Sequence, residues 1–250
     1  MKADDILEAV FEGRRPRLDR AVAATLRRRP PLAPGDRDEA FRRLPERHRR
    51  LLAVSDGMDL LAGSYRLFGW ANRTARAIPD WNSAERWKFA WAGHAAPWLC
   101  FGESVLGNQF AYREEDLAAG GRATVFELYA VTLEPLCEYR DFVHFFDGGF
   151  LNGVMDDDYH RRIAAAREQL GGFDLDQHLA YMPSPLLAGG RVDVQQLMPM
   201  RAEAHMIVNG DLWRQLAHLD SLEGLHGLEN YTDREGRLRL RPVWGSARTH

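Results

Sequence analysis

Residues 44–57 read LPERHRRLLAVSDG, and residues 65–69 read YRLFG. Pro45 suits the first turn of a helix, because its fixed φ fits that position and the N–H that it lacks is not needed there. Gly57 ends the helix, since glycine readily adopts the left-handed conformation common at helix C-termini. The residues at helical spacing that form the predicted buried face are His48, Leu51, Leu52 and Ser55. The sequence therefore predicts a short amphipathic helix followed by a strand.

Beyond residue 60 the hydrophobic pattern changes to short apolar runs, rich in aromatic residues and separated by Gly, Pro and Asn. Such runs are typical of strands. We expect an antiparallel sheet from the runs 65–70, 87–92, 97–102, 108–113 and 123–131. The run 87–92 is equally compatible with a helical turn. Gly107-Asn108 predicts a tight turn between the third and fourth runs.

The segment before the quoted helix also shows helical spacing. One helix is expected to begin near residue 4, and a second is expected from Pro16 to the basic cluster Arg27-Arg28-Arg29, whose charges suit a helix C-terminus. We divide the chain into an N-terminal helical extension over residues 1–35, an α+β domain over residues 36–220, and a C-terminal edge hairpin or loose tail over residues 221–250.

The C-terminal half mixes both patterns. The residues that would form one side of a helix after Thr132 are Leu133, Leu136, Cys137, Phe142, Phe145 and Phe146. Residues 156–170 predict a further helix, whose acidic first turn complements the helix dipole. We expect residues 192–208 to add strands or a hairpin to the sheet, and Asp211 to cap a short helix.

Composition and charge are those of an ordinary globular protein, with 45% hydrophobic residues, 28% charged residues and a net charge of −3. Residues 1–50 carry 14 Lys and Arg against 9 Asp and Glu, whereas residues 134–185 carry 10 Asp and Glu against 4 Arg. Such asymmetry can steer association with charged partners. Two cysteines without a CxxC spacing suit a reducing compartment. With neither a secretory signal at the start nor a long apolar run, we expect a cytoplasmic protein without a membrane partner.

No motif for catalysis, metal binding or a phosphate loop stands out. The nine histidines are scattered without metal-ligand spacing, and there is no Gly-x-Ser-x-Gly pattern. Cys100 lies in an apolar run, where cysteine acts as a small hydrophobe. Glu103, His94 and His205 have side chains suited to acid/base chemistry, but nothing in their spacing requires them to meet. We therefore expect no catalytic residue, cofactor or metal, and a binding protein rather than an enzyme.

The quoted helix resembles the opening helix of the SUKH superfamily, which includes a fungal cell-wall-assembly regulator and many bacterial immunity proteins. That family's pattern is Leu-Pro, an aromatic residue, an apolar pair and Asn-Gly. Here His48 stands in the place of the aromatic residue, and Asp56 in that of the asparagine. The resemblance covers about residues 40–150. The later segments that resemble the family, in the same order, are Tyr65 to Gly69, Trp87-Lys88-Phe89-Ala90 with Gly93, Leu99-Cys100-Phe101, Gly107 with Phe110-Ala111-Tyr112, and Phe142-Val143 with Phe145.

This resemblance implies an α+β fold, with a twisted, mostly antiparallel sheet and helices packed on it. It also implies a protein-binding role. Many bacterial members are similar to immunity proteins, which bind and neutralise a cognate toxin, often a nuclease or deaminase, by occluding its active site. The family has no shared catalytic residues to carry over. No direct contact with nucleic acid is expected.

We predict that the partner-binding site is the acidic segment formed by Asp147, Asp156, Asp157 and Asp158. Its charge would mimic a nucleic-acid backbone toward a basic nuclease and would raise the association rate. The three consecutive aspartates are also explained as the first turn of a helix. Two other functions remain open: a regulatory scaffold that binds a host protein through its basic N-terminal helices, and an enzyme of unrecognised type.

Overall fold

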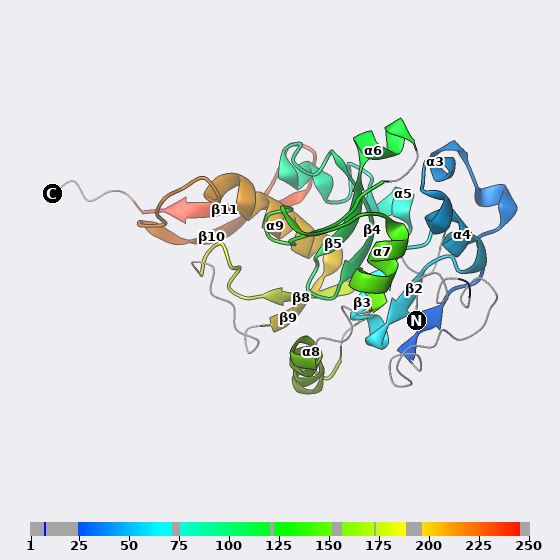
Figure 1. Cartoon of the computed structure of the whole chain (residues 1–250). Helices are drawn as coiled ribbons and strands as arrows, with labels where there is room; N and C mark the ends of the chain where they lie inside the picture. The colour runs from blue at the N-terminus through cyan, green and yellow to red at the C-terminus, as the bar shows by residue number, and fades with distance from the viewer. Residues whose placement is uncertain are drawn as a thin grey trace.

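The structure, a computed structural model, describes Glu8 and residues 25–71, 76–120, 123–151, 157–172, 174–188 and 197–245; it does not describe the side chains of residues 157–160. Its centre is a seven-stranded antiparallel sheet in which each strand pairs with the next one along the chain. Helices and two two-stranded sheets surround it (Figure 1). The predicted α+β class is confirmed.

The strands of the central sheet are β1 (Arg27–Arg28), β2 (Met58–Leu60), β3 (Tyr65–Leu67), β4 (Trp98–Ser104), β5 (Gln109–Arg113), β6 (Val125–Leu128) and β7 (Pro135–Tyr139). Four of the predicted runs are confirmed as β3, β4, β5 and β6. The turn at Gly107-Asn108 is confirmed too, because the Ser104 N–H donates to the Asn108 carbonyl at 2.9 Å and Gly107 has a φ of +90°.

Helical segments cover the sheet and its ends. Those up to β6 are η1 (Pro34–Asp36), α3 (Glu39–Arg42), α4 (Glu46–Val54), η2 (Leu61–Gly63), α5 (Ile78–Trp81), η3 (Lys88–Trp91) and α6 (Glu114–Ala119). Those after β7 are α7 (Phe142–Phe145), the π-helix η4 (Phe146–Leu151), α8 (Asp157–Leu170) and α9 (Ala202–Leu216). The small sheets are β8 (Gln177–Tyr181) with β9 (Leu197–Arg201), and β10 (Leu225–Thr232) with β11 (Leu238–Trp244).

The quoted motif forms α4 and a clasp that follows it. Pro45 is the N-cap, and the predicted inward positions His48, Leu51, Leu52 and Ser55 are all buried. The Asp56 carboxylate accepts hydrogen bonds from the Trp70 and Ala71 N–H groups, which follow β3. Gly57 has a φ of +97° and packs directly on the backbone of residues 67–69. The motif therefore ties the end of α4 to the end of β3.

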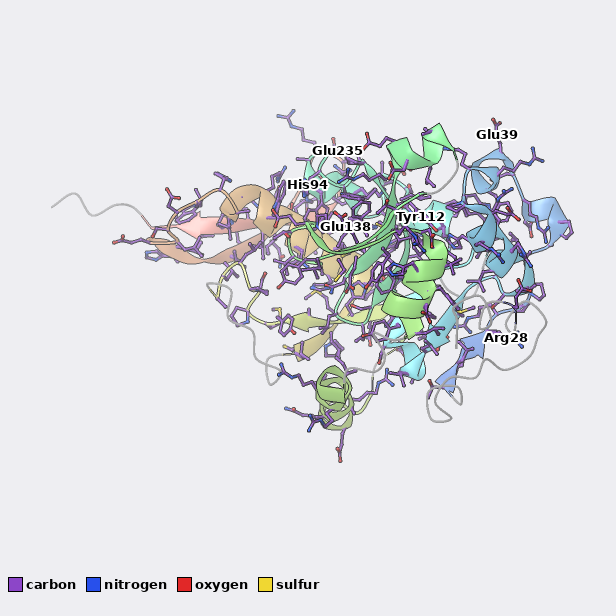
Figure 2. All side chains as sticks on the ribbon, viewed as in Figure 1. Arg28, Glu39, His94, Tyr112, Glu138 and Glu235 are labelled. Carbon is purple, nitrogen blue, oxygen red and sulfur yellow. The ribbon has the colours of Figure 1, made fainter. Side chains whose placement is uncertain are left out.

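The core is unusually rich in aromatic contacts. Phe101 of β4 stacks on Tyr112 of β5 at 4.5 Å between ring centroids, and His48 of α4 stacks on Phe142 of α7 at 4.4 Å. Tyr112 lies in the middle of the molecule, whereas Arg28 and Glu39 lie at its periphery (Figure 2). These stacked pairs fix α4 and α7 on the same part of the sheet.

Two predictions for the first hundred residues need correction. The cluster Arg27-Arg28-Arg29 does not form the last turn of a helix: Thr25 is helical, but Arg27–Arg28 is the edge strand β1, and Arg29 forms an ion pair with Asp59 at 3.0 Å. The run 87–92 is not a strand but contains η3, so its helical alternative holds. The predicted helices before residue 25 lie outside the described residues, Glu8 apart, and so does most of the predicted N-terminal extension.

The helix predicted directly after Thr132 is wrong. Residues 135–139 form β7, the outer strand of the sheet, and the helix begins only at Phe142. Leu136 and Cys137 are exposed on this strand, so no alternation between a buried and an exposed face marks it in the sequence. The spacing of Leu136 and Cys137 relative to Phe142 and Phe145 happens to match that of residues on one face of a helix.

The C-terminal elements differ from the prediction in how they pair. The helix at 156–170 is confirmed as α8. Strand β9 pairs with β8 rather than with the central sheet, and residues 202–216 form one long helix, so Asp211 lies inside α9 instead of capping it. The C-terminal segment does form a hairpin, but its strands pair only with each other. None of the described helices has the length and hydropathy of a membrane span.

Candidate functional site

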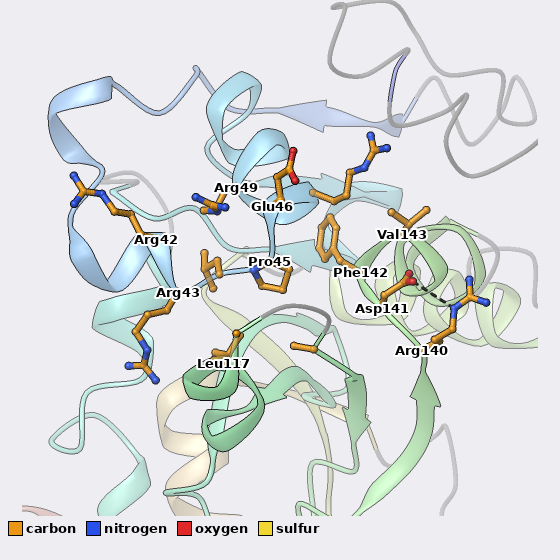
Figure 3. Close-up of a pocket in the computed structure, with 14 residues that line it drawn as sticks. Arg42, Arg43, Pro45, Glu46, Arg49, Leu117, Arg140, Asp141, Phe142 and Val143 are labelled. Carbon is orange, nitrogen blue, oxygen red and sulfur yellow. Dashed lines mark hydrogen bonds and ion pairs between the residues drawn. The ribbon is translucent and has the colours of Figure 1, made fainter.

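A cleft of about 770 Å³ is lined by five arginines. Arg42, Arg43 and Arg49 reach it from α3 and α4, and Arg140 reaches it from the end of β7 (Figure 3). Arg47 of α4 completes the set, while Glu46 and Asp141 are the carboxylates in the lining. The rest of the lining is largely apolar: Leu44, Pro45, Leu117, Gly120, Ala123, Phe142 and Val143.

The arginines of this cleft differ in how their charge is neutralised. Arg43 pairs with Glu114 at 2.8 Å, Arg47 with Glu8 at 3.2 Å, and Arg140 with Asp141 at 3.4 Å. Within the described part of the chain, Arg42 and Arg49 form no hydrogen bond or ion pair through their side chains, and the Nε of Arg49 is buried without a partner. Two guanidinium groups therefore remain open to a ligand. Sequence reasoning noted the basic excess before residue 50 but did not place it on one cleft.

A second group of charges is buried between the sheet and the C-terminal elements. Glu103 of β4 accepts hydrogen bonds from Arg66 of β3 and from Arg76. Arg66 also donates to the carbonyls of Gly63, Leu175 and Gln177, at 2.7–2.8 Å. The guanidinium of Arg66 thus joins β3 and β4 to the segment that leads into β8.

Two histidines extend this group to α9. His178 Nε2 lies 3.0 Å from Glu103, and its Nδ1 lies 3.1 Å from Nδ1 of His205. Asn209 Nδ2 donates to the Ala130 carbonyl and lies 3.0 Å from His205 Nε2. Sequence reasoning considered Glu103 with His205 but missed His178, which connects them. His94 is not part of the group: its Nε2 contacts the Thr132 carbonyl and its ring stacks on Trp213.

These partners determine where the protons lie. Because Asn209 donates to Nε2 of His205, the proton of that ring is on Nδ1 and is donated to His178. His178 then carries its own proton on Nε2 and donates it to the Glu103 carboxylate. The chain of hydrogen bonds runs in one direction, with both imidazoles neutral and the carboxylate charged. Gly107 packs against the two imidazole rings, and a Cβ at this position would lie only 2.9 Å from His178 Nδ1.

The pKa values of these groups agree with that assignment. Burial lowers the pKa of His178 to about 4, although the carboxylate of Glu103 acts in the opposite direction. Burial, together with the neighbouring His178, lowers the pKa of His205 to about 3. Burial alone would raise the pKa of Glu103, but the charge of Arg76, the hydrogen bond from His178 and the charge of Arg66 hold it well below its ordinary value.

We expect the free energy of unfolding to decrease as the pH falls from 7 to 4. The unfolded chain protonates these histidines near pH 6.5, whereas the folded chain keeps them neutral until about pH 4 and 3. The unfolded state therefore binds more protons in this range. The free energy of unfolding falls by roughly 1.4 kcal/mol for each buried histidine and each pH unit of acidification. Urea unfolding at half-unit pH steps measures the slope. His205→Gln should reduce it and the exposed-site variant His218→Gln should not; a flat profile from pH 6.5 to 4.5 contradicts the assignment.

The β10–β11 hairpin has one anchored face and one exposed apolar face. Arg239 of β11 is buried and its Nε donates to Asp211 of α9 at 3.0 Å. Side chains alternate along a strand, so Leu238 and Trp244 lie on the opposite face. They are 65% and 42% exposed, and Leu228 across the ladder is exposed too. Of the nine large hydrophobic side chains that are exposed in the described ranges, four belong to this hairpin.

The four predicted partner-binding aspartates are only partly described. Asp147 lies in η4 and is half-buried. Asp157 and Asp158 lie in the first turn of α8, but their side chains are outside the described structure, as is the whole of Asp156. The proposal that these carboxylates form one surface stays a prediction. Cys100, by contrast, is buried in β4 as expected, and burial raises the pKa of its thiol to about 12.

No protein-family model matches the chain, and no curated protein matches it. Among solved structures it is similar to the crystal structure of Atu4351 from Agrobacterium tumefaciens, with a TM-score of 0.47 and 14% sequence identity. The match covers 86% of this chain and 91% of that one. A likeness at this level identifies neither a family nor a function, so the resemblance to the SUKH superfamily stays a prediction.

Proposed function

We propose that this protein captures a partner protein and serves as an immunity protein, which neutralises a cognate bacterial toxin by covering its active site. The observation that carries the proposal is the outer face of the β10–β11 hairpin, with Leu228, Leu238 and Trp244 exposed together. Exposed apolar side chains gathered on one element mark interaction surfaces. Tryptophan is also enriched among the residues that contribute most to binding energy.

The anchoring of the hairpin supports this role. Asp211 holds Arg239 and also accepts a hydrogen bond from the Leu240 N–H at 2.9 Å, while Gln215 donates to the Leu240 carbonyl at 3.0 Å. Arg237 and Arg239 lie over the ring of Phe89. A surface that is already held in place loses little conformational entropy when a partner binds. The order of SUKH-like segments in residues 40–150 supports the more specific role of an immunity protein.

The test uses the product of the gene beside this one as the candidate toxin. We expect co-expression with this chain to restore growth of cells that make the toxin, and the purified proteins to associate. Because truncating a central aromatic anchor removes about 2 kcal/mol or more of binding energy, Leu238→Ser with Trp244→Ala should weaken binding by about thirtyfold or more. Leu136→Ser, which changes an exposed leucine of β7 instead, is the matched control.

Two results would count against this surface. Equal affinity of the hairpin variant and the parent chain would exclude the hairpin as the contact. If the triple variant Asp156/Asp157/Asp158→Ala weakens binding and the hairpin variant does not, the acidic segment is the contact instead, and that binding should also weaken as salt is raised. Failure to protect cells, with binding intact, would contradict the immunity role alone.

A further inference from the structure

The arginine-lined cleft lies on α3, α4 and the end of β7, at the other end of the molecule from the β10–β11 hairpin (Figure 1). Its volume of about 770 Å³ is that of a small-molecule site. An apolar floor, with Leu44, Leu117 and Phe142, combined with charged groups at the rim is the usual composition of such a site. The cleft is thus a feature separate from the proposed partner surface.

The state of Arg42 and Arg49 indicates the charge of the ligand. Within the described ranges both guanidinium groups lack a carboxylate partner, and the Nε of Arg49 is buried without an acceptor. The terminal nitrogens of the two guanidinium groups, which no described carboxylate neutralises, can donate to an anion that enters the cleft. Both arginines also line an adjoining hollow of about 450 Å³, as does Glu46.

We propose that this cleft binds a small molecule that carries a phosphate group. Two open guanidinium groups match the charge of a phosphate, close to −2 at neutral pH, better than that of a single carboxylate. The fork of donors on arginine fits phosphate oxygens in a bidentate manner. The floor would receive the organic part of the ligand. Of the two carboxylates in the lining, Asp141 pairs with Arg140, and Glu46, at the start of α4, opposes such a ligand.

Titration calorimetry of the full chain with pyrophosphate and with ADP, at low salt, tests the proposal. We expect saturable binding of both, weaker as salt is raised. Arg42→Gln with Arg49→Gln should weaken binding at least about tenfold, which corresponds to the loss of one charge-assisted contact. Glu46→Gln should strengthen it, because a repelling charge is removed. Arg201→Gln, an exposed arginine outside the cleft, should leave it unchanged.

Two outcomes would overturn the proposal: no saturable binding of either ligand, or equal binding by the double variant and the parent chain. A third would reassign the cleft: if neither ligand binds but the double variant loses an acidic partner protein, the arginines recognise protein. Thermal unfolding of each variant checks that the fold is kept, and Arg42 is exposed, so its replacement removes no core contact. The toxin-binding test at the hairpin is independent of all these results.

Discussion

Replacement of Glu103 by glutamine is expected to lower the free energy of unfolding by about 3–5 kcal/mol, the usual cost of breaking a buried ion pair from one side. The carboxylate is fully buried and is the charge partner of Arg66, Arg76 and the His178 donor. Without it, the buried guanidinium of Arg66 loses the carboxylate that it contacts and keeps only the weaker charge interaction with Asp59. A chain of this size should lose roughly 10 °C in melting temperature.

Two comparisons make this result specific. Glu138→Gln changes an exposed glutamate of β7 and should alter stability by less than about 0.5 kcal/mol. Arg76→Gln should cost less than Glu103→Gln, because it leaves Arg66 paired with Glu103. Urea unfolding measures all three. A loss below about 1 kcal/mol for Glu103→Gln would show that the cluster does not hold β8 and α9 on the sheet.

Gly57→Ala is expected to cost about 3 kcal/mol or more. Its φ of +97° is unfavourable for any residue with a Cβ, by about 1–2 kcal/mol. A Cβ at this position would also lie 2.9 Å from the Gly69 nitrogen and 3.0 Å from the Leu67 carbonyl oxygen. Relief of that contact requires movement of the backbone that carries the Trp70 N–H, the donor to Asp56. The substitution therefore disturbs both parts of the clasp.

Gly35 offers the matched control for this substitution. It lies in η1 with nothing near the position of an added Cβ, and its φ is not positive. Gly35→Ala should therefore leave stability within about 1 kcal/mol of the parent, or raise it slightly by restricting the unfolded chain. Similar losses at both glycines, measured by thermal and urea unfolding, would contradict the proposed clasp of α4 on β3.

The elements that sequence reasoning predicted well have a clear hydrophobic pattern, either one buried face, as in α4, or burial almost throughout, as in β4 and β5. Helix α4 places His48, Leu51 and Leu52 inward, and its ends are marked by Pro45 and Gly57. Strands β4 and β5 form long aromatic runs separated by a glycine turn. In each case the periodicity and the turn chemistry agree, so local sequence is sufficient.

The elements predicted wrongly lack such a pattern. Strand β7 is exposed along its length, so its apolar residues give no period-2 signal. The polar side chain of Asp211 indicates a helix cap when read locally. Inside α9 it is acceptable only because Arg239, almost thirty residues later, supplies a buried counter-charge.

The candidate sites were harder to predict than the fold. Glu103 and His205 were recognised as titratable, yet His178 and the two arginines that set their protonation come from other elements. One feature of the sequence pointed to the role of Arg66. It is a charged residue within the apolar strand YRLFG, and a buried charge there needs a partner of opposite charge. The basic excess before residue 50 is visible in the sequence, but its gathering around one cleft is not.

The sequence by itself determined the class of the fold, the position of α4 and the positions of strands β3 to β6, because these depend on hydrophobic patterning and on residues such as Pro45 and Gly57 that act over a few neighbours. Only the tertiary structure decided which charges meet. Arg66, Glu103, His178 and His205 come together because β3, β4, β8 and α9 pack there. Electrostatic interactions depend on distance in space and on burial, and neither is written in the spacing of residues along the chain.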